Sequence, residues 1–478
     1  MKPRAVIVGA GLGGCMLAHA LLPTHDVVIV ERGAEVEDPR YPVVDVGLPA
    51  VTQPHVGAGL GGSTQLWHNG LIEIDEEIFA AHWPFPKAEL DPFYAQAFEL
   101  LADTPLAHVR EAIERLRQRY RELGLPPGLM QGLYYPRWPR NLWTSLQLQG
   151  RVEVVRGNVV DFELGDGGAL AALTVEEGGE RRRVEGDVFV LAAGGLGTPV
   201  LLQKLARHLP LPGAAHAGAH YEDHPMTFVG EVEVTVPLYR LWNYRVPGTD
   251  GNLRLPLVVK RAGLHMSFQL RPAANYYRAS RREQVGSVLN DLRRNPWNPL
   301  HYARLFRHWD DILDILSFKF GIHLPTRHYT LLLCAQMPTA PERSVWSQPA
   351  QDGAGEAGVR CWTLPQAFRD HMDQAVQDVL AWLAPVTRSA RIFSGWQGDL
   401  RSAAHHSGTA RLSADASAGV CDVDGRVHGM ANLYVCDGAL IPASGIANTG
   451  LTIAALALRL AAHLRGRPAA APRASSQP

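Results

Sequence analysis

The stretch AVIVGAGLGG, residues 5–14, decides the fold class of this chain. Its first four residues are a short apolar run, which is typical of a strand buried in a parallel sheet. Gly9 permits a tight turn, Gly11 lets the backbone approach a phosphate, and Gly14 lets a helix pack closely on the strand. With a helix expected at residues 15–22, the stretch predicts the opening of a Rossmann-like α/β domain that binds a dinucleotide.

A second apolar run, residues 27–30, ends in Glu31. A carboxylate at the end of the second strand can accept hydrogen bonds from ribose hydroxyls and would repel a 2′-phosphate, so NADP is not expected. The order strand, turn, helix, strand and acid favours dinucleotide binding over a glycine-rich turn in an unrelated α/β fold. The motif by itself does not distinguish NAD from FAD.

The length and composition of the chain set its broad class. With 478 residues, 46% of them hydrophobic, the chain is too long for one ordinary core, so two domains are expected. The formal net charge is −1 and the charges are interspersed, which gives no reason to expect a nucleic-acid partner. The five cysteines form no CxxC pair, which is typical of reduced cysteines in a cytoplasmic protein.

Two features bear on secretion and membranes. The first strand begins at Ala5, so we expect no secretory signal peptide and a cytoplasmic location. The longest apolar run, residues 451–464, is shorter than the ~20 residues that span a bilayer. Membrane contact is therefore not expected, and the oligomeric state is not predicted.

Further segments divide the chain into two kinds of region. Residues 187–193 (DVFVLAA) and 433–438 (LYVCDG) are predicted as buried strands of the first domain, whereas residues 221–364 contain short alternating segments typical of an antiparallel sheet. We expect an α/β fold with a discontinuous Rossmann-like cofactor domain and an α+β substrate domain built on an antiparallel sheet. The cofactor domain is assigned to residues 1–82, 145–225 and 400–466, the substrate domain to residues 83–144 and 226–399, and a disordered tail to residues 467–478.

Five motifs resemble, in the same order, the signatures of the glucose–methanol–choline (GMC) oxidoreductases. They are GLGGSTQLWHNG (59–70), WPFPKAELDPFY (83–94), AAGGLGTPVLL (192–202), Asp223-His224-Pro225, and the block from HHSGT at residue 405 to ALRL at residue 460. The resemblance covers both ends and the middle of the chain and implies an FAD-dependent oxidoreductase that acts on alcohols. Within the family, the C-terminal block is most similar to bacterial sugar and polyol dehydrogenases.

The resemblance and the glycine loop together predict the residues that contact FAD. By the resemblance, the backbone of Val159 holds the adenine and the Asp437-Gly438 turn reaches the ribityl or pyrophosphate portion. The amides of residues 61–63 suit the pyrophosphate or the ring edges. The full predicted set is Gly9, Gly11, Leu12, Gly14, Glu31, Arg32, Gly61, Gly62, Ser63, Asn69, Gly70, Leu71, Val159, Ala193, Asp437, Gly438, Asn448 and Thr449.

Some members of the family attach FAD covalently through a histidine in the first loop. His68 matches that position only if an insertion in the loop shifts the register, and Leu66 occupies it by direct count. Non-covalent FAD is therefore expected.

Oxidation of an alcohol needs a base for the hydroxyl proton, and His405-His406 offers two candidates. The family pattern H-x-x-G-T selects His405. Neighbouring residues on an extended segment point to opposite faces, so His406 is expected to be a hydrogen-bonded wall residue. Asn448 matches the family's second catalytic position, where its amide would donate to the substrate oxygen, and it is also a candidate N-cap. The helix is expected from about Thr449, where the family usually has proline.

The resemblance implies that a hydride passes from the carbinol carbon to flavin N5 and that O2 or another acceptor reoxidises the flavin. We expect the substrate to be a secondary alcohol of a sugar, cyclitol or natural-product glycoside. The apolar stripe at residues 305–320 is interpreted as a buried lid helix, with contact to a membrane or a partner subunit as the alternative. Aromatic residues of the central region can stack on such a substrate or belong to the core: Trp242, Tyr244, Tyr276, Tyr277 and Trp309.

Several alternatives stay open at this point. The Rossmann-like opening also suits an NAD-linked dehydrogenase, although the C-terminal block argues against it. The same fold serves hydroxynitrile lyases, in which the flavin stays oxidised, and oxidases of aryl or aliphatic alcohols. A flavoprotein without catalytic activity is disfavoured because both His405 and Asn448 are present. Oxidase and dehydrogenase are not separated, because access of O2 depends on packing near flavin C4a.

Overall fold

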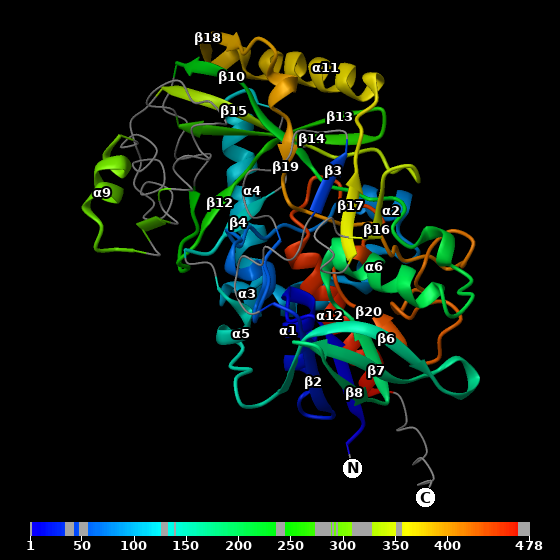
Figure 1. Cartoon of the computed structure of the whole chain (residues 1–478). Coiled ribbons are helices and arrows are strands. Elements are labelled where there is room, and N and C mark those ends of the chain that lie inside the picture. The colour runs from blue at the N-terminus through cyan, green and yellow to red at the C-terminus, as the bar shows by residue number, and fades with distance from the viewer. Residues whose placement is uncertain are drawn as a thin grey trace, which may run out of the picture.

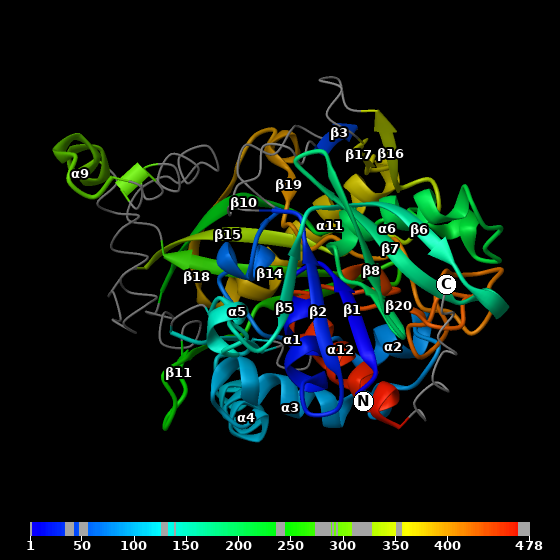
Figure 2. The same ribbon diagram turned by 60° about the horizontal axis from the view of Figure 1, so that its bottom comes forward.

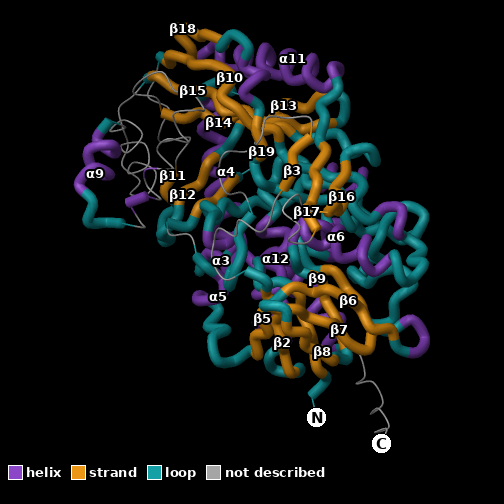
Figure 3. Tube along the Cα trace, viewed as in Figure 1, coloured by secondary structure: helices purple, strands orange, loops and turns teal. Residues whose placement is uncertain are grey.

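The computed structural model describes residues 2–33, 43–46, 56–125, 132–137, 140–235, 244–272, 288, 291–292, 295–307, 327–349 and 356–466. Figure 1 shows a parallel sheet on the side of the two termini and an antiparallel sheet at the opposite end of the molecule. In the view of Figure 3 the strands gather at these two ends and helices occupy the middle. The predicted combination of a Rossmann-like sheet and an antiparallel sheet is confirmed.

The parallel sheet has the strand order β20-β9-β1-β2-β5, and every neighbouring pair is parallel. Its strands are β1 (Arg4–Val8), β2 (Asp26–Glu31), β5 (Glu153–Arg156), β9 (Val188–Leu191) and β20 (Leu433–Val435). The apolar runs predicted as buried strands form its centre, since Ile7, Ile29 and Val190 are fully buried. The sheet is assembled from segments at both ends and in the middle of the sequence.

Helices pack on this sheet and on one another. Helix α1 (Leu12–Leu21) packs against α12 (Gly450–Arg465), which in turn packs against α3 (Asp91–Ala102). The Tyr94 hydroxyl lies 2.8 Å from the Thr452 hydroxyl across the second of these contacts. Figure 2, turned toward the bottom of the molecule, shows α1 and α12 beside β1 and β2.

The antiparallel sheet has the order β13-β14-β15-β10-β18, and β19 pairs with the start of β10. Its strands are β10 (Pro225–Val234), β13 (Leu257–Arg261), β14 (Leu264–Pro272), β15 (His328–Ala335), β18 (Thr387–Ile392) and β19 (Arg401–Ser402). The amphipathic helix α11 (Gln366–Leu383) covers it at the top of Figure 1 and buries Phe368, Met372 and Val379. Because β10 begins at Pro225 and β19 ends just before the His405 segment, this sheet delivers both motifs to one place.

Shorter elements complete the structure. Strand β17 pairs with β3 in parallel and with β16 in antiparallel register, and β6, β7 and β8 form a small antiparallel sheet. The remaining elements are α2 (Glu76–His82), α4 (Leu106–Glu122), α5 (Leu142–Ser145), α6 (Gly194–Ala206), α9 (Pro299–Phe306), β3 (Val43–Val46), β4 (Leu133–Tyr135), β6 (Asn158–Leu164), β7 (Leu170–Glu177), β8 (Glu180–Glu185), β11 (Tyr244–Arg245), β12 (Asn252–Arg254), β16 (Ser344–Pro349) and β17 (Glu356–Cys361).

Helix α6 begins at Gly194, where the Asp437 carboxylate accepts hydrogen bonds from the Gly194 amide and the Thr198 hydroxyl. One predicted helix differs from the structure. The lid interpretation is wrong for the part that is described, since α9 has no buried residue and Phe306 is 79% exposed. The rest of the stripe, with Trp242, Tyr276, Tyr277 and Trp309, lies outside the described residues.

The structure bears on the remaining fold predictions as follows. Within the described ranges, no helix combines the length and apolar character needed to cross a membrane. The strands of the parallel sheet all come from the ranges assigned to the cofactor domain, and those of the antiparallel sheet from residue 225 onward. The domain boundaries themselves stay a prediction, and residues 467–478 lie outside the described part of the chain.

Candidate active site and cofactor cradle

The first glycine loop joins β1 to α1. Gly9 has a φ of +109°, and a Cβ at this position would lie 2.4 Å from the Ala192 carbonyl oxygen, so only glycine fits. A Cβ on Gly14 would lie 2.1 Å from the Gly9 carbonyl oxygen, which confirms the predicted close packing of helix on strand. At Gly11, in contrast, a Cβ would meet only Ala192 at 3.9 Å, so the space before the helix is open.

A second glycine loop, residues 59–63, lies directly on the first. The Gly61 amide donates to the Ala10 carbonyl oxygen at 2.9 Å, and a Cβ on Gly62 would lie 2.8 Å from the Cα of Gly11. Gly61 and Gly62 both have positive φ values, and the exposed Ser63 accepts a hydrogen bond from the amide of Gly57. We call the two loops together, residues 9–14 and 59–63, the glycine cradle.

Glu31 organises the cradle from behind. Its carboxylate accepts hydrogen bonds from the backbone amides of Ala10 and Gly33, both at 2.8 Å, and of Gly59 at 3.3 Å. The residue is buried at the end of β2, as predicted. The three amide contacts show that this carboxylate holds the two loops together, and its predicted contact with ribose hydroxyls of the cofactor stays a prediction.

The predicted adenine and pyrophosphate contacts extend from this cradle. The amide of Gly157 donates to the Glu31 carbonyl oxygen at 3.1 Å, which brings the start of β6, with Val159, beside the end of β2. Arg32 is half-buried at the same end. The Ala193 amide donates to the Thr198 hydroxyl at the start of α6.

The Asp437 carboxylate is a structural tie between two strand ends. Besides Gly194 and Thr198 it accepts a hydrogen bond from the Ala439 amide at 2.8 Å. Burial raises the pKa of Asp437 to about 6. Because both oxygens are engaged within the protein, the predicted contact with the ribityl or pyrophosphate portion falls to the backbone around Gly438 rather than to this side chain.

The segment after the second loop carries three predicted contacts, Asn69, Gly70 and Leu71. Asn69 is wholly buried and donates from its side-chain amide to the Leu101 carbonyl oxygen, so its side chain points toward α3. The backbone of Leu71 pairs in both directions with Tyr134. The contacts of these residues with FAD stay predictions. His68 is exposed, and nothing in the described residues tests a covalent link there.

Gly70 is the point where this segment meets the second catalytic candidate. A Cβ at Gly70 would lie 2.8 Å from the side-chain amide nitrogen of Asn448 and 2.8 Å from the Tyr135 ring. The absence of a side chain at Gly70 therefore lets Asn448 and Tyr135 pack against its backbone. Asn448 is not the N-cap that was considered for it, because the capping position of α12 is Thr449. The Asn448 side chain is therefore available for contact with a substrate.

The N-termini of α1 and α12 face the same region and have no capping side chain. Gly11 at the start of α1 and Thr449 at the start of α12 make no side-chain cap, as is also the case for α2, α3, α4, α6 and α11. A Cβ on Gly450 would lie 3.4 Å from Leu12, so the two ends are close together. Their unsatisfied amides and positive dipole ends suit an anionic or electron-rich group.

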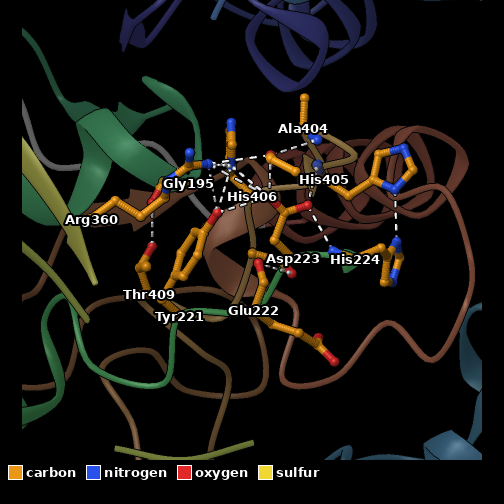
Figure 4. Close-up of polar contacts among 12 residues, drawn as sticks. Gly195, Tyr221, Glu222, Asp223, His224, Arg360, Ala404, His405, His406 and Thr409 are labelled. Carbon is orange, nitrogen blue, oxygen red and sulfur yellow. Dashed lines mark hydrogen bonds and ion pairs between the residues drawn. The ribbon is translucent and has the colours of Figure 1, made fainter. Parts of the chain in front are cut away.

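His405 and His406 point in opposite directions from the extended segment after β19 (Figure 4). The Nδ1 atom of His405 lies 2.7 Å from Nδ1 of His224, and the His405 amide donates to the Asp223 carboxylate at 3.0 Å. The Nδ1 atom of His406 lies 2.8 Å from the Tyr221 hydroxyl. The prediction that His406 is a hydrogen-bonded wall residue is confirmed.

Asp223 is the buried centre of this network. One carboxylate oxygen accepts from the amides of His224 and His405, and the other accepts from the hydroxyls of Tyr221 and Ser402 and lies 3.6 Å from the Arg360 guanidinium. Burial opposes ionisation of Asp223, but the charges of His406 and Arg360 and the Ser402 hydrogen bond outweigh it and lower its pKa to about 2. The carboxylate therefore stays negative beside His405.

Burial has the opposite consequence for the two facing imidazoles. It lowers the pKa of His405, and the charge of Asp223 opposes this shift. Burial also lowers the pKa of His224, to about 3. At neutral pH His405 is therefore an uncharged imidazole, the form that a general base needs, next to a carboxylate that stabilises the cation formed when it accepts a proton.

The C-terminal part of the chain matches a known protein family. Residues 362–457, which include both catalytic candidates, match the C-terminal family model described as GMC oxidoreductase. This segment is similar to the GMC oxidoreductases, and the chain is an FAD-dependent oxidoreductase. The family implies FAD as cofactor, alcohols as substrates, and O2 or other electron acceptors.

Solved structures show the same GMC fold along nearly the whole chain. Pyridoxine 4-oxidase from Mesorbium loti is 16% identical and covers 98% of this chain and 100% of its own, with a TM-score of 0.64. A formate oxidase from Aspergillus oryzae RIB40 is 15% identical over 97% of this chain and 98% of its own, with a TM-score of 0.59. At these identities the likeness concerns the fold.

One curated relative is similar over a short stretch. The 6'''-hydroxyparomomycin C oxidase of Streptomyces lividus is 40% identical over 77 residues, which are 15% of this chain and 14% of that protein. The match therefore spans a small part of the relative's length, and what that enzyme acts on enters only as support for a proposal.

The residues of this enzyme fit FAD. The glycine cradle leaves the space before α1 open at Gly11, and uncapped amides at the starts of α1 and α12 can meet the pyrophosphate and the ring. FAD supplies a ring that accepts a hydride. Within the described residues, no group of three or more histidines, cysteines or acids could hold a metal ion.

Sequence reasoning missed the partners of the base. His224 and Asp223 were noted only as part of a motif, and Tyr221, Arg360 and Ser402 were not considered. The available signal was the adjacency of an acid and a histidine in Asp223-His224-Pro225, since two titratable residues before a proline at the start of a strand are seldom placed for packing alone. The distance in sequence between His224 and His405 hid their contact.

Proposed function

We propose that this FAD-dependent oxidoreductase oxidises a secondary hydroxyl group of a sugar, a cyclitol or a glycosylated natural product to the carbonyl, with His405 as the base. The observation that carries the proposal is the state of His405. Its side chain is half-buried and uncharged at neutral pH, its backbone amide donates to the Asp223 carboxylate, and its Nδ1 atom lies 2.7 Å from Nδ1 of His224. Its Nε2 atom has no hydrogen-bond partner among the described residues and remains for the substrate.

The residues of the chain divide the work as follows. His405 takes the hydroxyl proton at Nε2, and the Asp223 carboxylate stabilises the resulting cation. The Asn448 amide, held against Gly70, donates to the substrate oxygen and orients the alcohol. FAD, when bound, accepts the hydride from the carbinol carbon.

The short similarity to 6'''-hydroxyparomomycin C oxidase supports a sugar-like substrate. This similarity favours a glycosylated natural product as substrate over a simple aryl or aliphatic alcohol. We also propose that FAD is bound non-covalently and that the protein is cytoplasmic. The electron acceptor is O2 or another acceptor.

The test is an anaerobic flavin titration. The FAD-loaded protein is mixed without oxygen with aminoglycosides, sugars, cyclitols, and aryl and aliphatic alcohols, and the visible absorbance of oxidised flavin is followed. We expect bleaching by a polyhydroxylated compound, loss of bleaching in His405→Ala, and unchanged bleaching in His108→Ala, which replaces an exposed histidine. Admission of air then separates an oxidase from a dehydrogenase.

Three outcomes would contradict the proposal. Bleaching by aryl or aliphatic alcohols alone would refute the substrate class. A flavin that stays oxidised while a substrate is cleaved would instead establish a lyase. Equal bleaching in His405→Ala and the wild type would remove His405 from the role of base.

A further inference from the structure

The contact between the imidazoles of His224 and His405 restricts where their protons lie; the inference drawn from it rests on the proposed function of His405 as base. The two Nδ1 atoms are 2.7 Å apart, which is a hydrogen bond between ring nitrogens. One of the two nitrogens must carry the proton and the other must be bare. The geometry around His224 decides which.

The Nε2 atom of His224 lies 2.9 Å from the carbonyl oxygen of Gly445. A carbonyl oxygen can only accept, so Nε2 of His224 carries a proton. A neutral imidazole has one proton, and His224 is neutral because it is fully buried and its pKa is far below its ordinary value. Nδ1 of His224 is therefore bare and accepts.

Ser444 is compatible with this assignment. Its hydroxyl lies 3.0 Å from a carboxyl oxygen of the buried Glu222, and that oxygen also accepts from the Ser444 amide at 2.9 Å. A Ser444 hydroxyl that donates to Glu222 leaves its oxygen to accept from Nε2 of His224, which lies 3.1 Å away. The Gly445 carbonyl oxygen thus places the His224 proton on Nε2, and the Ser444 oxygen is a second acceptor for it.

We propose that His224 is a positioning residue that holds His405 in the tautomer protonated at Nδ1, so that the lone pair of the base lies on Nε2. Because Nδ1 of His224 accepts, Nδ1 of His405 must donate. When the substrate O–H bond breaks, the proton forms a new N–H bond at Nε2 of His405, and the Nδ1–H remains donated to His224. The reaction therefore needs no rearrangement of protons at the base before it begins.

The positions of the charged and titratable groups around the His224–His405 pair can be stated for the described residues. Asp223 contacts the backbone of His405, Glu222 lies behind Ser444, and Arg360 and His406 lie on the far side of Asp223 (Figure 4). Of these, only Asp223 and His224 contact His405 directly in the bonds described above. A change in the pH profile on substitution of His224 therefore reports on the His224–His405 contact.

The first measurement is on the unmodified protein. Nitrogen-15 NMR of histidine-labelled, FAD-loaded enzyme distinguishes protonated from bare ring nitrogens, and the His405 signals are assigned by their loss in His405→Ala. We expect Nδ1 of His405 to be protonated and Nε2 to be bare at neutral pH. A His405 ring that carries its proton on Nε2 would overturn the proposal, whatever the activity of any variant.

The second measurement compares His224→Phe with His224→Asn. Phenylalanine keeps a ring but offers no acceptor, whereas the asparagine oxygen can accept from Nδ1–H of His405. We expect His224→Phe to slow flavin reduction on the order of 10- to 100-fold, with FAD still bound. Its pH profile should shift to lower pH, because the His405 cation has lost an acceptor, and His224→Asn should recover most of the rate.

The two proposals fail in different ways. If His405→Ala reduces flavin at the wild-type rate, the proposed function fails. If His405→Ala is inactive but His224→Phe has the wild-type rate and pH profile, the positioning role of His224 fails alone. Should His224→Phe not fold, the NMR measurement and His224→Asn still decide.

Discussion

The substitution Asp223→Asn probes the buried network most directly. The asparagine side chain keeps one oxygen that accepts from the backbone amides of His224 and His405. It places an NH2 group, which can only donate, at the position of the second carboxylate oxygen. The hydroxyls of Tyr221 and Ser402 can rotate and accept from that NH2 group. The guanidinium of Arg360, which is fully buried, cannot accept from that NH2 group and stays charged, and it keeps its hydrogen bonds to the Tyr221 and Ser402 hydroxyls.

The size of the expected loss of stability follows from the ion pair between Asp223 and Arg360. Removal of one partner of a buried ion pair costs about 3–5 kcal/mol. The Arg360 guanidinium also stacks 4.9 Å from the Trp362 ring centroid and 5.8 Å from that of Tyr221, which retains part of its stabilisation. We therefore expect Asp223→Asn to lower the free energy of unfolding by about 3 kcal/mol, the lower end of that range.

Urea unfolding of the FAD-loaded protein at neutral pH measures the effect. Asp373→Asn, at an exposed position of α11, is the matched control and should change the free energy of unfolding by less than about 0.5 kcal/mol. In the Asp223→Asn background, Arg360→Met should restore stability. The methionine removes the buried positive charge that has lost its partner carboxylate. If Asp223→Asn is as stable as Asp373→Asn, the assignment of Asp223 and Arg360 as an energetically coupled buried pair is refuted.

Three further predictions concern the cofactor and the reaction. Burial lowers the pKa of His405 from the ordinary histidine value of 6.5. The rate of anaerobic flavin reduction should therefore stay constant as the pH falls to 6.5 and decline only below it. A decline centred above pH 6.5 would contradict the burial argument. Gly9→Ala should abolish FAD loading, measured by the ratio of visible to protein absorbance, because its Cβ would meet Ala192 at 2.4 Å, whereas Gly124→Ala, also at positive φ but with nothing within 4 Å, should load normally. Asn448→Ala should slow flavin reduction by about 100-fold with FAD content unchanged, and an equal loss of FAD would point to a cofactor role instead.

Local patterns were sufficient for the elements that form the cradle. The apolar runs of β1 and β2, the glycines between them and Glu31 lie within one short segment, so their spacing alone predicts a strand, a turn, a helix and a strand. The resemblance extended this to the C-terminal segment with His405 and Asn448.

Contacts between distant segments were not accessible in the same way. The amides that engage Glu31 belong to residues 10, 33 and 59, and the carboxylate that starts α6 comes from Asp437, so neither follows from a spacing rule. The position of Glu31 behind the two glycine loops and the first turn of α6 both depend on such contacts. The His224–His405 contact joins the starts of two segments that the antiparallel sheet brings together.

The strand order β20-β9-β1-β2-β5 has a consequence for the biosynthesis of the enzyme. The N-terminal strands emerge from the ribosome first, but β20 and the start of α12 are among the last elements made. At ~5–20 residues per second, the nascent chain waits roughly 20 to 90 seconds between the synthesis of Gly9 and that of Asn448. During that interval the β9 edge and the apolar face that α12 will cover have no native partner, so they stay open to contact with other chains. The residues predicted to contact FAD between Asp437 and Thr449 are thus available to the cofactor only late in synthesis.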